Sequence, residues 1–444
     1  MKILLIYPNL NQEIIGYGDL GAIAEPLALE YLAASCVDFA SEVKLLDLRL
    51  HPDDLEPILD NFRPDIVALT GYSMHVIRML EIARITRDHL VQTKIVVGGH
   101  HATLLPEDFK TEDIDFIVVG EGTVPFRALT EMLSHEMTHS IAGIWSNDRG
   151  DWTFGGNQPT LELEKVVPPL RSLCLADRQH YFIDWMKPIA LLRTTVGCPY
   201  RCSFCSLWKM MDGHYYRRDV DSVVSELLNI EEPYVFLVDD EPFVNAKRMD
   251  LLAEGIKDSG VNKEYFSYCR IDTLVKNKTT LEKWIEIGLR RVFLGIEGVT
   301  TNEMESYNKR LSISQIEEGI KSARALGLKV FASFIVSPLY TKADFTRLSR
   351  FIERNHIDYP SFTILTPLPG TDDFISQYDL ITDRQPNGRP DWSKWDLQHL
   401  VVPSVLSKTE FEKEYQKLRM NFRGAYEIHQ RKATIARSTL IHNI

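Results

Sequence analysis

Residues 196–205 read Val196-Gly197-Cys198-Pro199-Tyr200-Arg201-Cys202-Ser203-Phe204-Cys205. They follow a strand-like apolar run that ends with Leu191-Leu192-Arg193-Thr194. Three thiolates so close in sequence are typical ligands of a metal centre, and soft thiolates select iron-sulfur clusters, zinc or copper(I). A 4Fe-4S cluster has four irons, so Cys198, Cys202 and Cys205 would leave one iron with an open coordination position.

A zinc site is the alternative for these cysteines. Three Cys and one His form a legitimate zinc set, and His214 follows the loop closely enough to be the fourth ligand. The protein would then be a zinc-stabilised binding protein without catalysis. Zinc would leave the rest of the chain unexplained, so we favour the cluster.

Composition narrows the class of protein. The 444 residues suffice for two or three domains, and the net charge of -12 argues against a nucleic-acid-binding protein. Six cysteines, three of them in one loop, do not suggest a disulfide framework, so a reducing cytoplasm is the expected location. The apolar start of the chain is too short for a signal peptide and is expected to be a β-strand. No stretch approaches the roughly 18 apolar residues of a membrane span.

Residues 1–145 alternate between strand and helix signals, which predicts a parallel, doubly wound sheet of the Rossmann-like or flavodoxin-like kind. The expected strands are 3–7, 43–46, 65–70, 94–97 and 114–119. Ligands of such sheets bind beyond the carboxyl ends of the strands. The candidate ligand-binding residues at those ends are Ser73, Gly98, Gly99, His100, Gly120 and Glu121.

A connection over residues 146–187, rich in Gly and Pro, leads to a second α/β region at 188–372. Six strands are expected there, at 189–194, 234–238, 265–269, 291–296, 329–335 and 361–365. Charged residues follow three of them: Asp239 and Asp240, then Arg270, then Glu297. The rest of the chain, 373–444, is expected to be a small, mostly helical extension.

The cysteine spacing, with Phe204 directly before the last cysteine, resembles the signature of the radical S-adenosylmethionine (radical SAM) enzymes. The resemblance implies a partial (β/α)6 barrel and S-adenosylmethionine on the open iron, where its cleavage gives a 5'-deoxyadenosyl radical. It also implies that Asp239 and Asp240 hold the methionyl amino group and that Arg270 meets the carboxylate. Glu297 would lie under the ribose, and the Phe204 backbone would meet the adenine.

Cys269 lies outside the cysteine motif. It is a candidate proton or hydrogen donor near the substrate. A small buried side chain in a strand is the commoner role of a free cysteine.

The first region is similar to the cobalamin-binding domain of many radical SAM enzymes, through Pro26 to Ala33, Val97 to Thr103 and Ile114 to Gly122. The resemblance implies that the residues at its strand ends bind cobalamin, if cobalamin is bound. The Asp-x-His-x-x-Gly motif that supplies a histidine ligand to cobalt is absent. His75 is the one candidate near the third strand, and an ordinary first-turn histidine is the simpler interpretation.

The tail, from Trp395 to Pro403, resembles that of the hopanoid C-3 methylases, and in radical SAM enzymes such an extension commonly closes the barrel. We therefore expect a cobalamin-dependent radical SAM C-methyltransferase that acts on an unactivated carbon of a small molecule, such as a lipid or natural-product intermediate. A flavodoxin- or ferredoxin-type protein would donate the electron. The alternative within the family is a dehydratase, oxidase or cyclase whose N-terminal domain carries no cobalamin.

Overall fold

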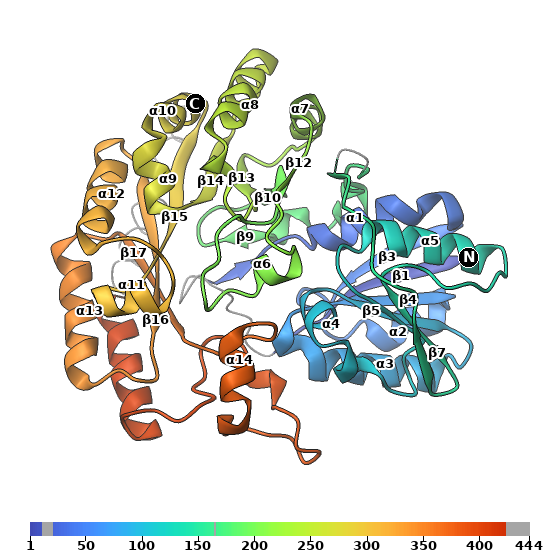
Figure 1. The fold of residues 1–444 in the computed structure, drawn as a ribbon. Coiled ribbons are helices and arrows are strands. Elements are labelled where there is room, and N and C mark those ends of the chain that lie inside the picture. Colours follow the sequence, from blue (N-terminus) through green and yellow to red (C-terminus); the bar gives the residue numbers. More distant parts are fainter. Residues whose placement is uncertain (11–20, 164–165, 423–444) are drawn as a thin grey trace.

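The two large sheets of the protein lie in separate halves of the molecule (Figure 1). The computed structural model describes residues 1–10, 21–163 and 166–422. The N-terminal sheet has seven strands and the second has six. Both have helices packed against them, as the α/β pattern of the sequence predicted.

The first sheet has the strand order β3-β1-β4-β5-β6-β7-β8. Its strands are β1 Lys2–Tyr7, β3 Glu42–Asp47, β4 Ile66–Thr70, β5 Lys94–Gly98, β6 Phe116–Val118, β7 Ile144–Asp148 and β8 Asp151–Phe154. The first five are parallel and confirm the predicted strands. The last two are antiparallel additions to the edge, in a range where the sequence had predicted a domain connection.

Helices cover both faces of this sheet. Helices α1 Leu27–Cys36 and α5 Thr123–Ser134 pack on one face, and α2 Leu55–Phe62 and α3 Val76–His89 pack on the other. Burial on both sides explains why β1 is apolar at four consecutive positions instead of alternating. The carboxyl ends of the strands remain as the edge where ligands of such folds bind.

The second sheet is an open barrel with the order β10-β13-β14-β15-β16-β17, all parallel. Its strands are β10 Ile189–Leu192, β13 Tyr234–Leu237, β14 Glu264–Cys269, β15 Leu289–Glu297, β16 Lys329–Val336 and β17 Tyr359–Ile364. The outer helices are α7 Val220–Leu228, α8 Ala246–Ser259, α9 Ile271–Lys276, α10 Lys278–Glu286, α11 Thr301–Ser306, α12 Ile313–Ala325 and α13 Lys342–Arg354. Six strands in this arrangement confirm the predicted partial barrel.

The two edge strands of the barrel are satisfied by groups from outside it. On β10, the Leu191 N–H donates to the Glu25 carboxylate and the Leu191 carbonyl accepts from Arg171 at 2.7 Å. On β17, the Phe362 carbonyl accepts from Tyr415 Oη at 2.9 Å, and Ile364 N donates to the Leu397 carbonyl at 2.7 Å. Because an open sheet edge exposes unpaired backbone groups, these contacts take the place of neighbouring strands.

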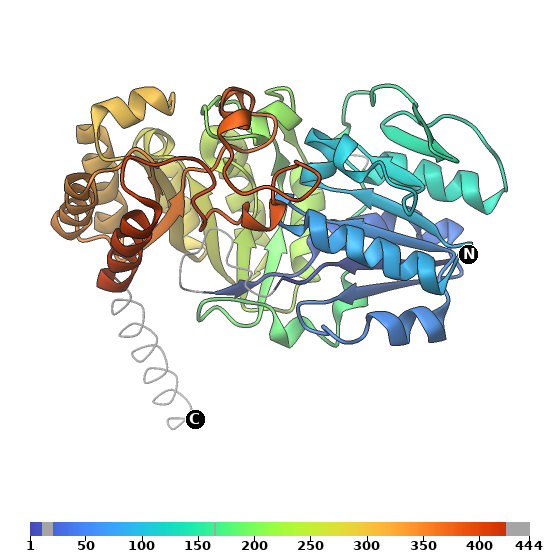
Figure 2. The same cartoon turned by 90° about the horizontal axis from the view of Figure 1, so that it is seen from below.

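The C-terminal extension packs against both halves of the molecule (Figure 2). Helix α14 Asp372–Gln377 and the turn Trp392–Lys394 place Phe374, Trp392 and Trp395 in the apolar core that also contains α2 and α3. The last described helix, 408–422, packs Phe411 on the barrel. The predicted extension therefore joins the two halves as well as covering the β17 edge, and helical signals predicted beyond 422 lie outside the described residues.

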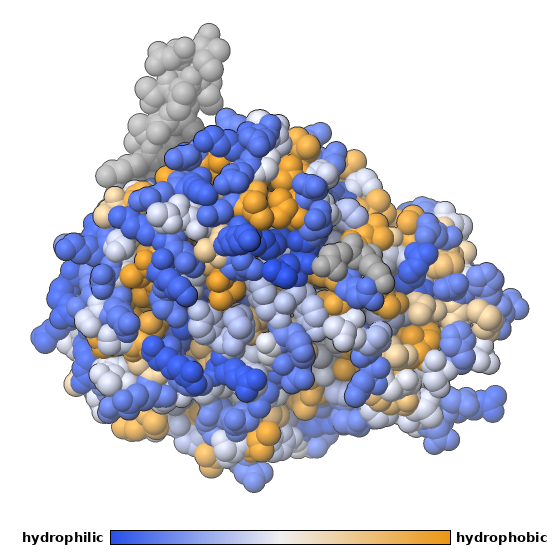
Figure 3. All heavy atoms as spheres, turned by 45° about the horizontal axis from the view of Figure 1, so that its top comes forward, coloured by the Kyte–Doolittle hydropathy of each residue, from blue (hydrophilic) through white to orange (hydrophobic). Residues whose placement is uncertain are grey.

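Hydrophilic side chains cover most of the face drawn in Figure 3, and apolar ones form smaller areas between them. Over the part of the chain that the structure describes, no helix combines the length and the apolar character that crossing a membrane requires.

Candidate active site

The three cysteines lie on one excursion above the barrel, which we call the cysteine loop (residues 197–206). A small hairpin closes its base, where β11 Thr195–Val196 pairs with β12 Tyr216–Arg217. Gly197 has a φ of +90°, and a Cβ there would collide with the carbonyl of His214. A glycine is therefore required at the entrance to the loop.

Asp239 and Asp240 follow β13 and hold the entrance of the cysteine loop. Asp239 is fully buried and accepts hydrogen bonds of 2.6 Å from the backbone amides of Thr194 and Thr195 and from the Thr194 hydroxyl. Asp240 accepts from Gly197 N at 2.8 Å. Burial raises the pKa of Asp239, and it raises that of Asp240 to about 6. Both oxygens of Asp239 are thus occupied, whereas Asp240 is partly exposed.

Glu241, the next residue, is fully buried, and burial raises its pKa to about 8. One of its oxygens accepts from the backbone N–H of Arg270 at 2.8 Å. The other, Oε1, has no hydrogen-bond partner among the described residues. A buried carboxylate oxygen without a donor is costly, so this atom is suited to a positively charged ligand.

Arg270 lies directly beneath the cysteine loop at the end of β14. Its Nη1 is 3.7 Å from the sulfur of Cys202, and its Nη2 donates to the Lys309 carbonyl at 3.2 Å. The guanidinium also stacks on the ring of Tyr200, 3.7 Å from its centroid. This predicted residue therefore shares one site with the cysteines.

Glu297 ends β15 with a φ of +71° and is buried, and burial raises its pKa. One oxygen lies 3.6 Å from Nζ of the buried Lys309, and the other accepts from the Ser333 hydroxyl at 3.3 Å. Phe204 packs edge-on against Tyr307, with ring centroids 5.6 Å apart. Glu297 thus lies at the carboxyl end of the barrel, and Phe204 lies in the cysteine loop itself.

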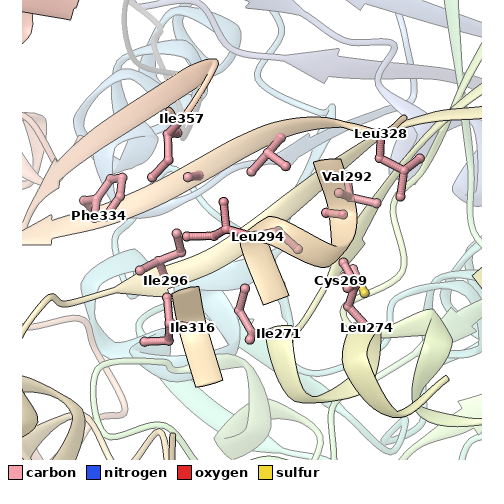
Figure 4. Close-up of a cluster of buried hydrophobic side chains, with 14 of the residues drawn as sticks. Cys269, Ile271, Leu274, Val292, Leu294, Ile296, Ile316, Leu328, Phe334 and Ile357 are labelled. Atoms are coloured by element: carbon pink, nitrogen blue, oxygen red, sulfur yellow. The ribbon is translucent and has the colours of Figure 1, made fainter. Parts of the chain in front are cut away.

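Cys269 is the predicted residue that the structure places elsewhere. Its side chain is 2% exposed and packs with Ile271, Leu274 and Val292 in the core between strands and helices (Figure 4). Burial raises its pKa well above the ordinary value of a thiol. In the structure it has the position of a core residue.

The candidate residues of the first sheet come together at its carboxyl edge. Gly99 and Gly120 have φ values of +95° and +90°, and a Cβ on Gly99 would come within 2.9 Å of the Gly71 backbone. Gly98 precedes them on β5, and Glu121 accepts from Thr123 N at 2.9 Å. Ser73 is buried, with its hydroxyl 2.9 Å from Nδ1 of His101.

The carboxyl edges of the two sheets face each other. Nε2 of His100, at the end of β5, lies 2.9 Å from the Ser206 hydroxyl in the cysteine loop. Arg193, at the end of β10, stacks on Tyr31 at 4.1 Å and approaches Glu121 to 4.0 Å. The site predicted from the first region and the site predicted from the cysteines are therefore adjacent.

Comparison with known proteins agrees with this arrangement. Residues 15–130 match the model of the B12 binding domain, and residues 192–352 match that of the radical SAM superfamily. The chain is 30% identical, over 382 residues, to an uncharacterized methyltransferase of Pyrococcus horikoshii, covering 84% of this chain and 82% of that one. The chain belongs to the cobalamin-binding radical SAM enzymes.

Other relatives of this radical SAM enzyme include the hopanoid C-3 methylase of Methylococcus capsulatus, which is 29% identical over 429 residues, 94% of this chain and 79% of the relative. Among solved structures, the cobalamin-dependent radical enzyme OxsB aligns with a TM-score of 0.72 at 18% identity, over 96% of this chain and 71% of OxsB. The methyltransferase TsrM of Kitasatospora setae aligns with a TM-score of 0.67 at 17% identity, over 98% and 99%. The cofactors of the family are a 4Fe-4S cluster, S-adenosylmethionine and cobalamin.

The donor set of the radical SAM enzyme fits a 4Fe-4S cluster. Burial raises the pKa of Cys198 to about 12 and that of Cys205 to about 11, so metal ions are needed to hold these sulfurs as thiolates. Within the described ranges, no three His, Cys, Asp or Glu side chains are grouped so that they could hold a metal ion. In a cluster each cysteine binds a different iron, so the three sulfurs need not converge on one point.

His214, the proposed fourth zinc ligand, is engaged differently. Its Nδ1 lies 3.1 Å from the Met211 carbonyl, and its ring stacks on Tyr216 with centroids 5.8 Å apart. The ring is thus directed to the base of the cysteine loop.

Four residues of the radical SAM site carry no role in the sequence-based assignment: Glu241, Lys309, Ser206 and Arg193. Glu241 stood in the Asp239-Asp240-Glu241 run at a strand end, which was a usable signal. Lys309 and Ser206 lie in loops whose contacts join residues distant in sequence. No local pattern identifies them.

Proposed function

We propose that the protein is a cobalamin-dependent radical SAM methyltransferase that acts on an unactivated carbon of a small molecule. The observation that carries the proposal is the 2.9 Å contact between His100 and Ser206, which joins the cobalamin-binding edge to the cysteine loop. Methyl transfer requires that a substrate meets both cofactors at one place. When bound, the cluster and S-adenosylmethionine supply radical chemistry, and cobalamin supplies the methyl group.

Three groups are proposed to bind the methionyl end of S-adenosylmethionine. Arg270 is suited to its carboxylate through the outer N–H groups of its guanidinium, because its Nε is already paired with Asp272 at 3.0 Å. The free oxygen of Glu241 and the partly exposed Asp240 are suited to its ammonium group. Asp239 instead positions the cysteine loop, because Thr194 and Thr195 occupy both of its oxygens.

The ribose and adenine are proposed to lie over the carboxyl end of β15. Glu297 offers carboxylate oxygens to hydroxyl groups there; burial raises the pKa of this carboxyl, and the nearby charge of Lys309 opposes that rise. The backbone of Phe204 is proposed to meet the adenine. These roles retain the sequence-based assignment and add Lys309 to it.

A substrate with a substantial apolar part suits the barrel interior. Phe236 stacks on Phe266, and Phe331 stacks on Tyr359, in both cases with centroids 4.5 Å apart. Above them, Tyr268 and Phe293 meet edge-on at 5.1 Å and remain partly exposed. Aromatic surfaces of this kind favour apolar ligands, which is consistent with a lipid or a natural-product intermediate.

Cobalamin is proposed to bind at the carboxyl edge of the first sheet, against Gly98, Gly99 and Gly120, with Ser73, His100 and Glu121 around it. Glycines with positive φ allow a large ligand to approach the backbone closely. His75 is fully buried and its Nδ1 accepts from Tyr72 N at 3.0 Å, so we assign it no cobalt ligation.

The electron is proposed to come from a flavodoxin- or ferredoxin-type protein in a reducing cytoplasm. This setting is proposed because the six described cysteines are unpaired and three of them serve the cluster.

The test is an anaerobic assay on protein reconstituted with iron, sulfide and hydroxocobalamin. S-adenosylmethionine carrying a deuterated methyl group is added with a reductant and an extract of the source organism. The expected products are 5'-deoxyadenosine, S-adenosylhomocysteine and a compound that gains the deuterated methyl group. Cys202→Ala is the control and should form no 5'-deoxyadenosine.

Two results would contradict the proposal. Protein that forms 5'-deoxyadenosine but retains no cobalamin and transfers no methyl group would be a dehydratase, oxidase or cyclase of the same family. Protein that contains zinc, but no iron and no acid-labile sulfide, would not be a radical enzyme.

A further inference from the structure

His100 connects the two cofactor regions directly. It begins helix α4 His100–Leu104, immediately after β5, and its Nε2 is 2.9 Å from the hydroxyl of Ser206. Ser206 is buried and directly follows the cluster ligand Cys205. It occupies the N-cap position of helix α6 Leu207–Met210, yet its side chain makes no capping bond. Its hydroxyl is directed instead to His100.

Ser206 is the residue between the cluster ligand Cys205 and the amides that begin helix α6. Burial raises the pKa of the Cys205 thiol, and the backbone amides of Leu207 and Trp208, the two residues after Ser206, lower it. Hydrogen bonds to cluster sulfurs are one of the factors that set the electronic properties of an iron-sulfur cluster. A change in the hydrogen bond of the Ser206 hydroxyl is therefore separated from the cluster by one residue, the ligand Cys205.

The second ring nitrogen of His100 faces away from this contact. Nδ1 is buried and has no hydrogen-bond partner within the described part of the chain. The ring lies 5.7 Å from that of Tyr72, which is 47% exposed at the carboxyl edge of the first sheet. Burial lowers the pKa of His100 to about 4, so the ring is neutral at physiological pH.

A neutral imidazole carries one proton, so a partner at one nitrogen determines the role of the other. If Nδ1–H donates to a ligand, Nε2 accepts a hydrogen bond from the Ser206 hydroxyl. If Nδ1 accepts from a ligand, Nε2–H donates to Ser206, and the Ser206 proton is free to turn elsewhere. A ligand at Nδ1 therefore determines whether Nε2 donates a hydrogen bond to Ser206 or accepts one from it.

We propose that His100 is a positioning residue that transmits corrinoid occupancy of the first sheet to the cysteine loop, through the tautomer of its ring. The ligand group at Nδ1 is an amide side chain of the corrin, because an amide offers both a carbonyl acceptor and an N–H donor. This inference rests on the proposed function, since it requires that a corrinoid binds at this edge.

The test compares the electron paramagnetic resonance spectrum of the reduced cluster with and without a corrinoid. Hydrogenobalamin is the probe, because it keeps the corrin amides and lacks cobalt, whose own signal would overlap. In the unaltered protein we expect the cluster signal to shift when hydrogenobalamin binds. Iron content and circular dichroism are recorded for every variant, so that loss of fold is recognised.

Two conservative variants separate the two nitrogens. In His100→Gln the amide reaches the position of Nε2, so the spectrum without corrinoid should match the unaltered protein while the corrinoid-induced shift is lost. In Ser206→Ala the spectrum without corrinoid should change, and His100→Ala should show the same change. The double variant should show a change of the same size as either single variant, not the sum of the two. Asp372→Asn, which removes an exposed 3.2 Å contact to Lys209 of helix α6, is the matched control and should behave as the unaltered protein.

Three results would overturn the inference. They are a full corrinoid-induced shift in His100→Gln, additive changes in the His100→Ala and Ser206→Ala double variant, and binding of hydrogenobalamin to the unaltered protein with no shift. If equilibrium dialysis shows that the unaltered protein binds neither hydrogenobalamin nor hydroxocobalamin, the proposed function fails as well.

Discussion

Two buried glutamates near the start of the chain should respond oppositely to the same substitution. Both belong to an ion-pair cluster that joins the N-terminal region, the connection and the barrel. Its carboxylates are Glu25, Glu30, Glu226 and Glu232, and its guanidinium groups belong to Arg171, Arg178 and Arg218. Four carboxylates thus share three positive charges.

Glu25 is the well-paired member of this cluster. Its two oxygens lie 2.6 Å from Arg171 and 2.6 Å from Arg178, and it also accepts from the Leu191 N–H. Glu25→Gln removes the charge and leaves two partly buried guanidinium groups poorly compensated. Breaking a buried pair in this way costs about 3–5 kcal/mol of unfolding free energy.

Glu30 is the excess carboxylate. Its Oε1 is 3.4 Å from Arg178, and its Oε2 is 3.8 Å from Arg171 with no hydrogen-bond partner among the residues described. Burial, with a further contribution from Glu25, raises its pKa from 4.5 to about 8. The folded state therefore holds a proton that the unfolded state releases, so the stability of the unaltered protein falls as pH rises from 4.5 to 8. Glu30→Gln keeps the uncharged form at every pH.

The assay is denaturant unfolding of the anaerobically purified proteins at pH 6 and pH 8.5. Between pH 6 and the pKa of about 8, each pH unit lowers the unfolding free energy of the unaltered protein by about 1.4 kcal/mol. Glu30→Gln avoids this loss. Its unfolding free energy relative to the unaltered protein should therefore be about 3 kcal/mol higher at pH 8.5 than at pH 6. Glu25→Gln should be destabilised at both. Equal destabilisation by the two substitutions, or a Glu30→Gln difference independent of pH, would show that Glu30 is not protonated in the folded protein.

Further substitutions test other parts of the structure. Gly197→Ala should abolish cluster loading, measured by iron and sulfide content, because its Cβ would collide with a backbone carbonyl. Gly156→Ala is the control and should load normally, because Gly156 also has a positive φ, +94°, but has open space around it. Cys269→Ala should leave 5'-deoxyadenosine formation unchanged while lowering thermal stability, and a loss of that activity at full cluster content would restore it as a hydrogen donor. Tyr415→Phe should cost about 1–2 kcal/mol of unfolding free energy, because it removes a hydrogen bond from the Phe362 carbonyl at the β17 edge. No change in the Tyr415→Phe unfolding curve would contradict the edge-pairing account.

Apolar runs predicted the parallel strands of both sheets because burial on two faces leaves a continuous apolar signal. Strands β7 and β8 were missed, since their sequence, with Ser146, Asn147 and Asp148, is polar and pairs only at the sheet edge. Local sequence also failed to show that the extension packs Trp392 and Trp395 on the first sheet. Such contacts depend on the tertiary arrangement.

The site residues were predicted by position at strand ends, and most of them do meet there. Strand alternation held additional information, because it places Phe266 and Tyr268 inside the barrel and Cys269 on the helix side. The same alternation directs the side chains of Asp239 and Asp240, which are neighbours in sequence, to opposite sides. The contact between His100 and Ser206 joins residues 106 positions apart, so no local pattern could reveal it.

Binding of S-adenosylmethionine to the open iron can be measured by electron-nuclear double resonance on the reduced cluster, with the cofactor labelled with oxygen-17 in its carboxylate. We expect hyperfine coupling between the labelled carboxylate and the cluster, because Cys198, Cys202 and Cys205 leave one iron for this ligand. A fully loaded, reduced cluster that shows no such coupling at saturating S-adenosylmethionine would contradict this assignment.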